Sequence, residues 1–208
     1  MKKLCIYHGN CADGFGAATI IRIALGRHKV EFHPGVYQEP PPDVTGREVV
    51  LVDFSYKRDV LLEMAEKAKH ILILDHHKSA EADLVDLPDN IEAHFDMERS
   101  GAMMAWDYHN PGDEPPALIR HIQDRDLWQF KLDGTREIQA CVFSHPYEFE
   151  LWEHLLSANL QELRKEGEAI ERKHFKDVNE LIKSHAYRMI IGGYDVPVLN
   201  APYFYSSD

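Results

Sequence analysis

Several features are scarce in this sequence of 208 residues. The three cysteines are an odd number at unrelated spacings, which excludes a disulfide framework and a cysteine-rich zinc knuckle. No apolar stretch approaches the ~20 residues that span a bilayer. The apolar run that follows the basic start of the chain ends at His8, too soon for a signal peptide. These absences predict a protein of the reducing cytoplasm that has no membrane partner.

Positive charge is also scarce, because the formal net charge is −12. Long duplex nucleic acid binds to basic surfaces, so it is not expected as a partner. An acidic cluster that holds divalent metal ions can nevertheless attract phosphate, since the ions reverse the local field. The acidity of the chain therefore leaves small phosphorylated ligands open.

The pattern of apolar residues predicts the fold class. The composition, 44% hydrophobic and 28% charged, is typical of globular domains. Apolar strand-like runs alternate with segments of helical periodicity, which predicts an α/β fold with a parallel sheet flanked by helices. Strands are predicted over residues 2–7, 30–32, 48–54, 70–75 and 91–95, and helices over 13–25, 57–68, 101–106 (capped by Ser100) and 116–124.

Three segments are predicted along the chain. Residues 1–150 form the α/β domain, and residues 151–186 form a helical connector, because a long helix from Leu160 to about Ser184 carries only a narrow apolar stripe. Two short strands around Gly192-Gly193 predict that residues 187–208 begin a second, smaller α/β domain, truncated where the sequence stops.

Ionisable side chains follow the predicted strands. They are His8, Asp13, Asp53 and the triplet Asp75-His76-His77. Ligands of parallel α/β sheets bind at the carboxyl ends of the strands, so these residues are expected to converge at one sheet edge. Crowded carboxylates repel one another, and divalent cations would relieve that repulsion.

Histidine and aspartate ligands without thiolates favour Mn²⁺ or Mg²⁺, with Co²⁺ or Zn²⁺ as alternatives. Two such ions about 3.5 to 4 Å apart can clamp an in-line displacement at phosphorus and activate water. One carboxylate must then bridge both ions, and Asp53 is the candidate because its strand lies between those of His8 and His76. One histidine of the doublet would ligate, and its neighbour would contact the substrate phosphate.

His8 with Asp13-Gly14, then Asp53, then Asp75-His76-His77 resembles the DHH phosphoesterase family over about residues 2–128. That family includes single-strand exonucleases, short-oligonucleotide ribonucleases, cyclic dinucleotide phosphodiesterases and related inorganic pyrophosphatases. The resemblance implies a DHH-domain fold and a manganese-dependent hydrolase. Its substrate would be a nucleotide or a short single-stranded oligonucleotide.

The resemblance also implies roles for individual residues. His76 would be a metal ligand, His77 a phosphate contact that assists catalysis, and Asp75 the group that orients the pair. In the segment IQDRDLW, Asp124 is implied as a ligand of the second ion, with Asp126 as the alternative. The neighbouring Arg125 is a candidate phosphate contact or a surface ion pair.

Two departures from the family pattern leave alternatives open. Cys11 stands where a carboxylate is expected, so Asn10 could supply an oxygen ligand, Cys11 a thiolate, or Cys11 could serve only in packing. The glycine-rich motif of the family's smaller domain is absent from the sequence. The alternative function is a metal- or nucleotide-binding module with little or no catalysis. The oligomeric state stays open, a dimer included.

Overall fold

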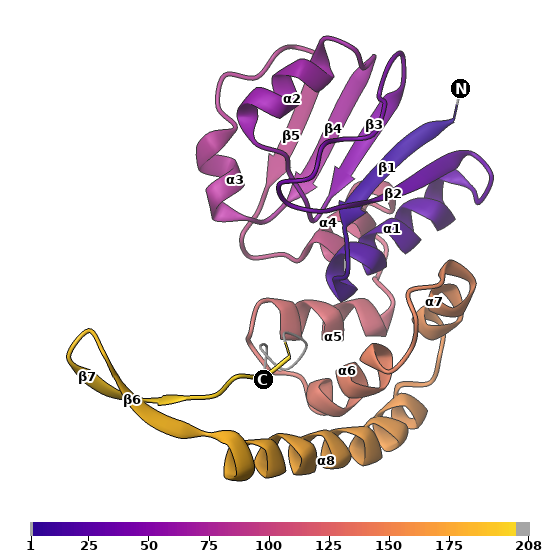
Figure 1. Cartoon of the computed structure of the whole chain (residues 1–208). Coiled ribbons are helices and arrows are strands. Elements are labelled where there is room, and N and C mark those ends of the chain that lie inside the picture. The colour runs from indigo at the N-terminus through magenta and orange to yellow at the C-terminus, as the bar shows by residue number, and fades with distance from the viewer. Residues whose placement is uncertain (1, 203–208) are drawn as a thin grey trace.

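The structure is a computed structural model that describes residues 2–202. Its centre is a five-stranded parallel sheet (Figure 1). In spatial order the strands are β2 (Val30–Gly35), β1 (Lys3–His8), β3 (Glu48–Val52), β4 (His70–Asp75) and β5 (Ile91–Phe95). The α/β class and the parallel sheet predicted from the sequence are confirmed.

Apolar layers cover both faces of the sheet. In β3, Val50 and Val52 pack in one layer with Phe15 of α1, whereas Val49 and Leu51 pack in the other with residues of α2. Both faces are buried, so the strands are nearly continuous apolar runs. The helices of this part of the chain are α1 (Ala12–Leu25), α2 (Arg58–Ala65), α3 (Lys78–Asp83) and α4 (Gly101–His109).

Four further helices follow the sheet. They are α5 (Ala117–Asp126), α6 (Thr135–Phe143), α7 (Phe149–Leu156) and α8 (Leu160–His185). The α6 helix packs against both α5 and α8. The helices α3, α6 and α7, of six, nine and eight residues, were not predicted from the sequence. Within residues 2–202, none of the helices combines the length and apolar character that a membrane crossing requires.

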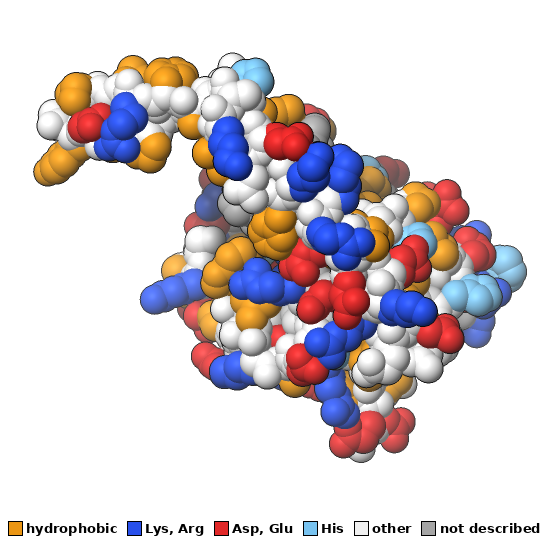
Figure 2. All heavy atoms as spheres, turned by 90° about the horizontal axis from the view of Figure 1, so that it is seen from below, with side chains coloured by type: hydrophobic (Ala, Val, Ile, Leu, Met, Phe, Trp, Pro, Cys, Tyr) orange, Lys and Arg blue, Asp and Glu red, His pale blue; other side chains and the backbone are white. Residues whose placement is uncertain are grey.

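An antiparallel hairpin of β6 (Tyr187–Ile191) and β7 (Tyr194–Val198) follows α8 and projects from the body (Figures 1 and 2). The pairing register places six apolar residues on one face: Tyr187, Met189, Ile191, Tyr194, Val196 and Val198. The two strands predicted around Gly192-Gly193 are therefore confirmed. Their assignment to a second domain stays a prediction, as does the connector role of α8.

The third strand ends earlier than predicted. The sequence pattern continued to residue 54, but β3 ends at Val52 because Asp53 adopts a left-handed backbone conformation, with a φ of 54°. Its N–H still donates to the carbonyl of Leu74 at 2.9 Å. The turn therefore lifts the Asp53 side chain off the sheet while the backbone remains anchored to β4.

Two glycines near the start of α1 differ in the space around them. A Cβ atom on Gly14 would lie 2.4 Å from the carbonyl oxygen of His8, whereas one on Gly16 would meet its nearest neighbours at 3.4 Å. We expect Gly14→Ala to lower the free energy of unfolding by about 1–3 kcal/mol, since α1 must move away from the end of β1. The matched variant Gly16→Ala should be neutral or stabilising, because alanine favours helices by ~1 kcal/mol. Denaturant unfolding of both variants checks this, and equal losses would contradict it.

Candidate metal centre

The carboxyl edge of the sheet brings His8, Asp53 and His76 together. Asp53 is 1% exposed and lies between the two histidines. Its Oδ1 is 3.1 Å from Nε2 of His76, and its Oδ2 is 3.4 Å from Nδ1 of His8. Each carboxylate oxygen of Asp53 therefore faces a different imidazole, from a different strand.

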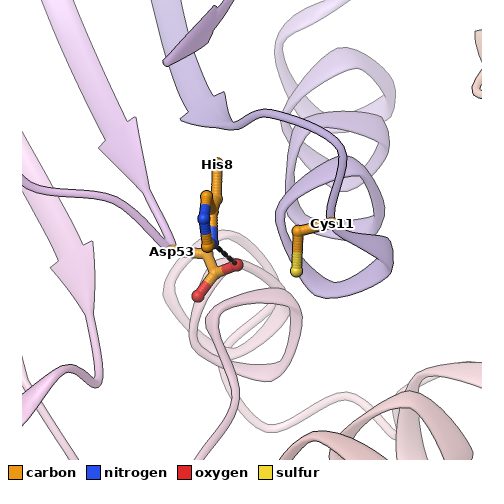
Figure 3. A group of neighbouring side chains, drawn as sticks. All are labelled: His8, Cys11 and Asp53. Carbon is orange, nitrogen blue, oxygen red and sulfur yellow. Dashed lines mark ion pairs between the residues drawn. The ribbon is translucent and has the colours of Figure 1, made fainter. Parts of the chain in front are cut away.

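The Asp53 carboxylate is held in its charged form. Burial raises its pKa, but the hydrogen bond from His76 and the nearby His8 ring lower it to about 2. Its Oδ2 is buried and accepts no hydrogen bond from residues 2–202. Figure 3 shows this carboxylate beside His8, with the thiol of Cys11 across from it. A buried anionic oxygen without a hydrogen-bond donor is unfavourable, and a water molecule or a cation would satisfy it.

A second group of potential ligands consists of Asp13, His76 and Asp126. Nε2 of His76 lies 3.3 Å from Oδ2 of Asp126 and 3.9 Å from Oδ2 of Asp13. Burial and then the charge of Asp53 raise the pKa of both Asp13 and Asp126. Burial lowers the pKa of His76, but its hydrogen bond to Asp53 and the surrounding carboxylates raise it to about 9. The cluster is thus crowded with negative charge that a cation would neutralise.

Asp13 is fixed by the first turn of α4. Its Oδ2 accepts from the N–H of Gly101 at 2.5 Å, and its Oδ1 accepts from the N–H of Ala102 at 3.0 Å. These are free donors at a helix N-terminus, where negative charge is favoured. A Cβ on Gly101 would lie 2.4 Å from the Cβ of Asp53, so only glycine allows α4 to approach the cluster this closely.

Asp75 positions the histidine doublet. This carboxylate is fully buried and accepts hydrogen bonds from Oγ of Ser55 at 2.6 Å, from the N–H of His76 at 2.8 Å, and from Nδ1 of His77 at 2.6 Å. The bond to Asp75 raises the pKa of His77, although burial lowers it. With its Nδ1 engaged by Asp75, the His77 ring can present its Nε2 to a ligand.

The structure does not bring Asp124 to the cluster, although the family resemblance implied it as the ligand. Its carboxylate accepts from the N–H groups of Lys131 at 2.7 Å and Leu132 at 3.0 Å, and from Oγ1 of Thr135 at 2.6 Å. Residues two apart on a helix point in nearly opposite directions. Of the pair on α5, Asp126 therefore faces His76, while Asp124 holds the loop that precedes α6.

The remaining predicted residues have different surroundings. Cys11 is the N-cap of α1, makes no side-chain capping bond, and its Sγ lies within 4.8 Å of the nearest ligand atoms of His8 and Asp53. Its thiol thus faces the cluster and not the core. Asn10 is exposed on a left-handed turn. The guanidinium of Arg125 stacks over Phe143 at 4.4 Å.

Tyr37 is a neighbour of the cluster that was not predicted from the sequence. Its ring contacts His8, with centroids 5.4 Å apart, and lies 6.5 Å from the ring of His77. The side chain is prominent on the surface, since the residue is 49% exposed. Tyr37 follows the carboxyl end of β2, so the strand-end rule would have found it if β2 had been extended beyond Phe32.

Comparison with known proteins does not assign a function. No family model matches the chain. An uncharacterized protein of Acanthamoeba polyphaga mimivirus is 32% identical over 170 residues, covering 74% of this chain and 40% of that protein. The crystal structure of an uncharacterized protein from Helicobacter pylori is similar in fold, with a TM-score of 0.53 at 13% identity, over 82% of this chain and 56% of that one. The chain thus spans less than two thirds of each of these two proteins.

The two aspartates of α5 provide a matched test of the site. Asp126→Asn should weaken Mn²⁺ binding on the order of tenfold to hundredfold, which is the loss typical of removing even an outer-shell partner. The free energy of unfolding should change little. Asp124→Asn should leave Mn²⁺ affinity nearly unchanged. It should lower the free energy of unfolding by about 1–3 kcal/mol, because an amide N–H₂ would face an N–H or O–H donor.

Calorimetric titration with Mn²⁺ and denaturant unfolding measure the two effects on the same proteins. Loss of metal affinity in Asp124→Asn, with Asp126→Asn unaffected, would contradict this assignment of the α5 residues.

Proposed function

We propose that the side chains gathered at the strand ends bind two divalent metal ions, Mn²⁺ in the first place, and that the protein is a metal-dependent phosphodiesterase. These side chains, called the strand-end cluster, are His8, Cys11, Asp13, Asp53, His76 and Asp126. The observation that carries this proposal is the position of Asp53, whose two buried oxygens face two separate ligand groups. Asp53 would thereby help to hold both ions, and two ions held close together can stabilise the attacking and leaving oxygens of an in-line displacement. Mg²⁺ or Co²⁺ could replace Mn²⁺ with these ligands.

The two ligand groups differ in their number of carboxylates and therefore in their expected affinity for a divalent ion. One consists of Asp13, His76 and Asp126 with Oδ1 of Asp53, and it has three carboxylates. The other consists of His8 and Cys11 with Oδ2 of Asp53, and it has one. The separations of 3.1 to 3.9 Å around His76 suit atoms that share an ion at about 2.1 Å, which lie ~3 Å or slightly more apart. The three-carboxylate group would fill first.

Bound ions would supply charge neutralisation at phosphorus and activation of water. The protein's own residues supply positioning. His77 is oriented by Asp75 and partly exposed, and its hydrogen bond to the Asp75 carboxylate favours an imidazolium that can bind a phosphate oxygen. His77 and His8 lie with ring centroids 5.9 Å apart, so a phosphate group bound by His77 would also lie near His8.

The proposed substrate is a nucleotide or a short single-stranded oligonucleotide. This choice follows from the resemblance to DHH phosphoesterases and from the net charge of −12, which disfavours long duplexes. The half-exposed ring of Tyr37 beside His8 and His77 is suited to stack on a nucleobase or sugar next to the phosphate.

A second candidate function is a metal- or nucleotide-binding module with little turnover, and Cys11 is the observation that favours it. Burial, and then the charges of Asp53 and Asp13, raise the pKa of the Cys11 thiol. A thiol ligates only after it loses its proton, so the group that contains His8 starts at a disadvantage for a metal ion. If that group stays unfilled at cellular Mn²⁺ concentrations, two-ion catalysis would be lost.

Turnover in the presence of Mn²⁺ decides between these functions. The substrates are a short RNA, a single-stranded DNA, a cyclic dinucleotide and pyrophosphate. We expect the wild-type protein to hydrolyse at least one nucleotide substrate and the Asp53→Asn variant to hydrolyse none of them. His77→Ala should lower kcat by roughly 10²-fold, the scale of one lost transition-state contact, with Mn²⁺ affinity nearly intact. His76→Ala should lose both turnover and metal binding.

Two outcomes would contradict the proposal. Absence of turnover on all four substrates, with one or two Mn²⁺ ions bound per chain, would favour the binding module. Equal loss of metal affinity in His77→Ala and His76→Ala would mean that both histidines ligate, and the phosphate-binding role of His77 would be wrong.

A further inference from the structure

A second cluster of metal-binding side chains lies where α6 meets α8. Cys141, His145 and Glu166 place one sulfur, one imidazole nitrogen and one carboxylate oxygen within 4.8 Å of one another. None of the three belongs to the strand-end cluster. Figure 1 shows α6 and α8 together on the side of α5 away from the sheet.

Local structure brings the three residues together. Cys141 is in the last turn of α6, and the chain then turns so that the N–H of His145 donates to the carbonyl of Val142 at 3.2 Å. The α8 helix approaches α6 very closely at Gly167, where a Cβ would lie only 1.6 Å from the carbonyl oxygen of Glu137. This contact fixes the adjacent Glu166 against α6.

Exposure differs across the cluster in a way that suits an ion at the surface. Cys141 is fully buried, His145 is half-buried and Glu166 is exposed. An ion can therefore enter from solvent on the side of Glu166 and His145, while the thiol binds it from the protein interior.

We propose that Cys141, His145 and Glu166 bind one zinc ion, which ties α8 to α6. One thiolate, one imidazole and one carboxylate are the three ligand types that zinc accepts, and a water molecule can complete a tetrahedral site. A thiolate ligand disfavours Mn²⁺ and Mg²⁺, the ions proposed for the strand-end cluster.

The state of Cys141 without an ion accounts for the proton balance. Burial, then the charge of Glu166 and a hydrogen bond to it, raise the pKa of Cys141 to about 11. The thiol is therefore protonated at neutral pH. Zinc would form a bond to sulfur as the S–H bond breaks, and one proton would pass to solvent for each ion bound.

Cobalt is the probe for this site, because Co²⁺ bound to a thiolate has a charge-transfer absorption that Co²⁺ bound by nitrogen and oxygen lacks. The full chain is used in a Cys11→Ala background, which removes the thiol from the strand-end cluster. We expect added Co²⁺ to produce the absorption with the amplitude of one thiolate-bound ion per chain, zinc to displace it, and Cys11→Ala/Cys141→Ala to lack it.

His145→Ala provides a second variant that leaves the core intact. In the same Cys11→Ala background it should weaken cobalt binding at this site by on the order of tenfold or more, since a direct ligand matters at least as much as an outer-shell partner. The control His154→Ala removes an exposed histidine of α7 and should change nothing. The proposal is overturned if Cys11→Ala gives no charge-transfer absorption, or if the absorption survives in Cys11→Ala/Cys141→Ala.

Discussion

The buried charge of Asp53 is the constraint on which the rest of the structure depends. A carboxylate placed at the end of the central strand, almost without exposure, costs free energy unless cations or donors surround it. His8 and His76 approach it from the two neighbouring strands, one to each oxygen. The left-handed backbone at Asp53 and the absence of a side chain at Gly101 are what allow this arrangement. The strand order, the glycine at position 101 and the positions of the two histidines therefore all accommodate the buried side chain of Asp53.

The charges around Asp53 support the proposal that the cluster binds metal ions and is not a simple salt bridge. Asp13 and Asp126 stand near Asp53, and burial together with that charge raises the pKa of both. The N-terminus of α4 stabilises Asp13 but leaves Asp126 without a comparable partner among the hydrogen bonds of the described chain. Divalent ions would offset this repulsion, and the carboxylates of Asp13, Asp53 and Asp126 match hard cations.

Much of this arrangement could be predicted from the sequence, because strand ends carry their side chains to a common edge. The apolar runs before His8, Asp53 and Asp75 located three adjacent strands correctly. The choice between Asp124 and Asp126 depended on which face of α5 meets the sheet, and a short motif does not contain that information. Tyr37 was missed because a polar and proline-containing stretch hid the end of β2. The direction of the Cys11 thiol likewise follows from tertiary packing.

Crystals of the full chain grown with Mn²⁺ test the central claim most directly, by anomalous scattering at the manganese edge. The account predicts two anomalous peaks, one on each side of the Asp53 carboxylate. The first would contact Asp13, His76 and Asp126, and the second would contact His8. A single peak bound without Asp53, or no peak at the strand ends at a Mn²⁺ concentration that calorimetry shows to be saturating, would contradict it.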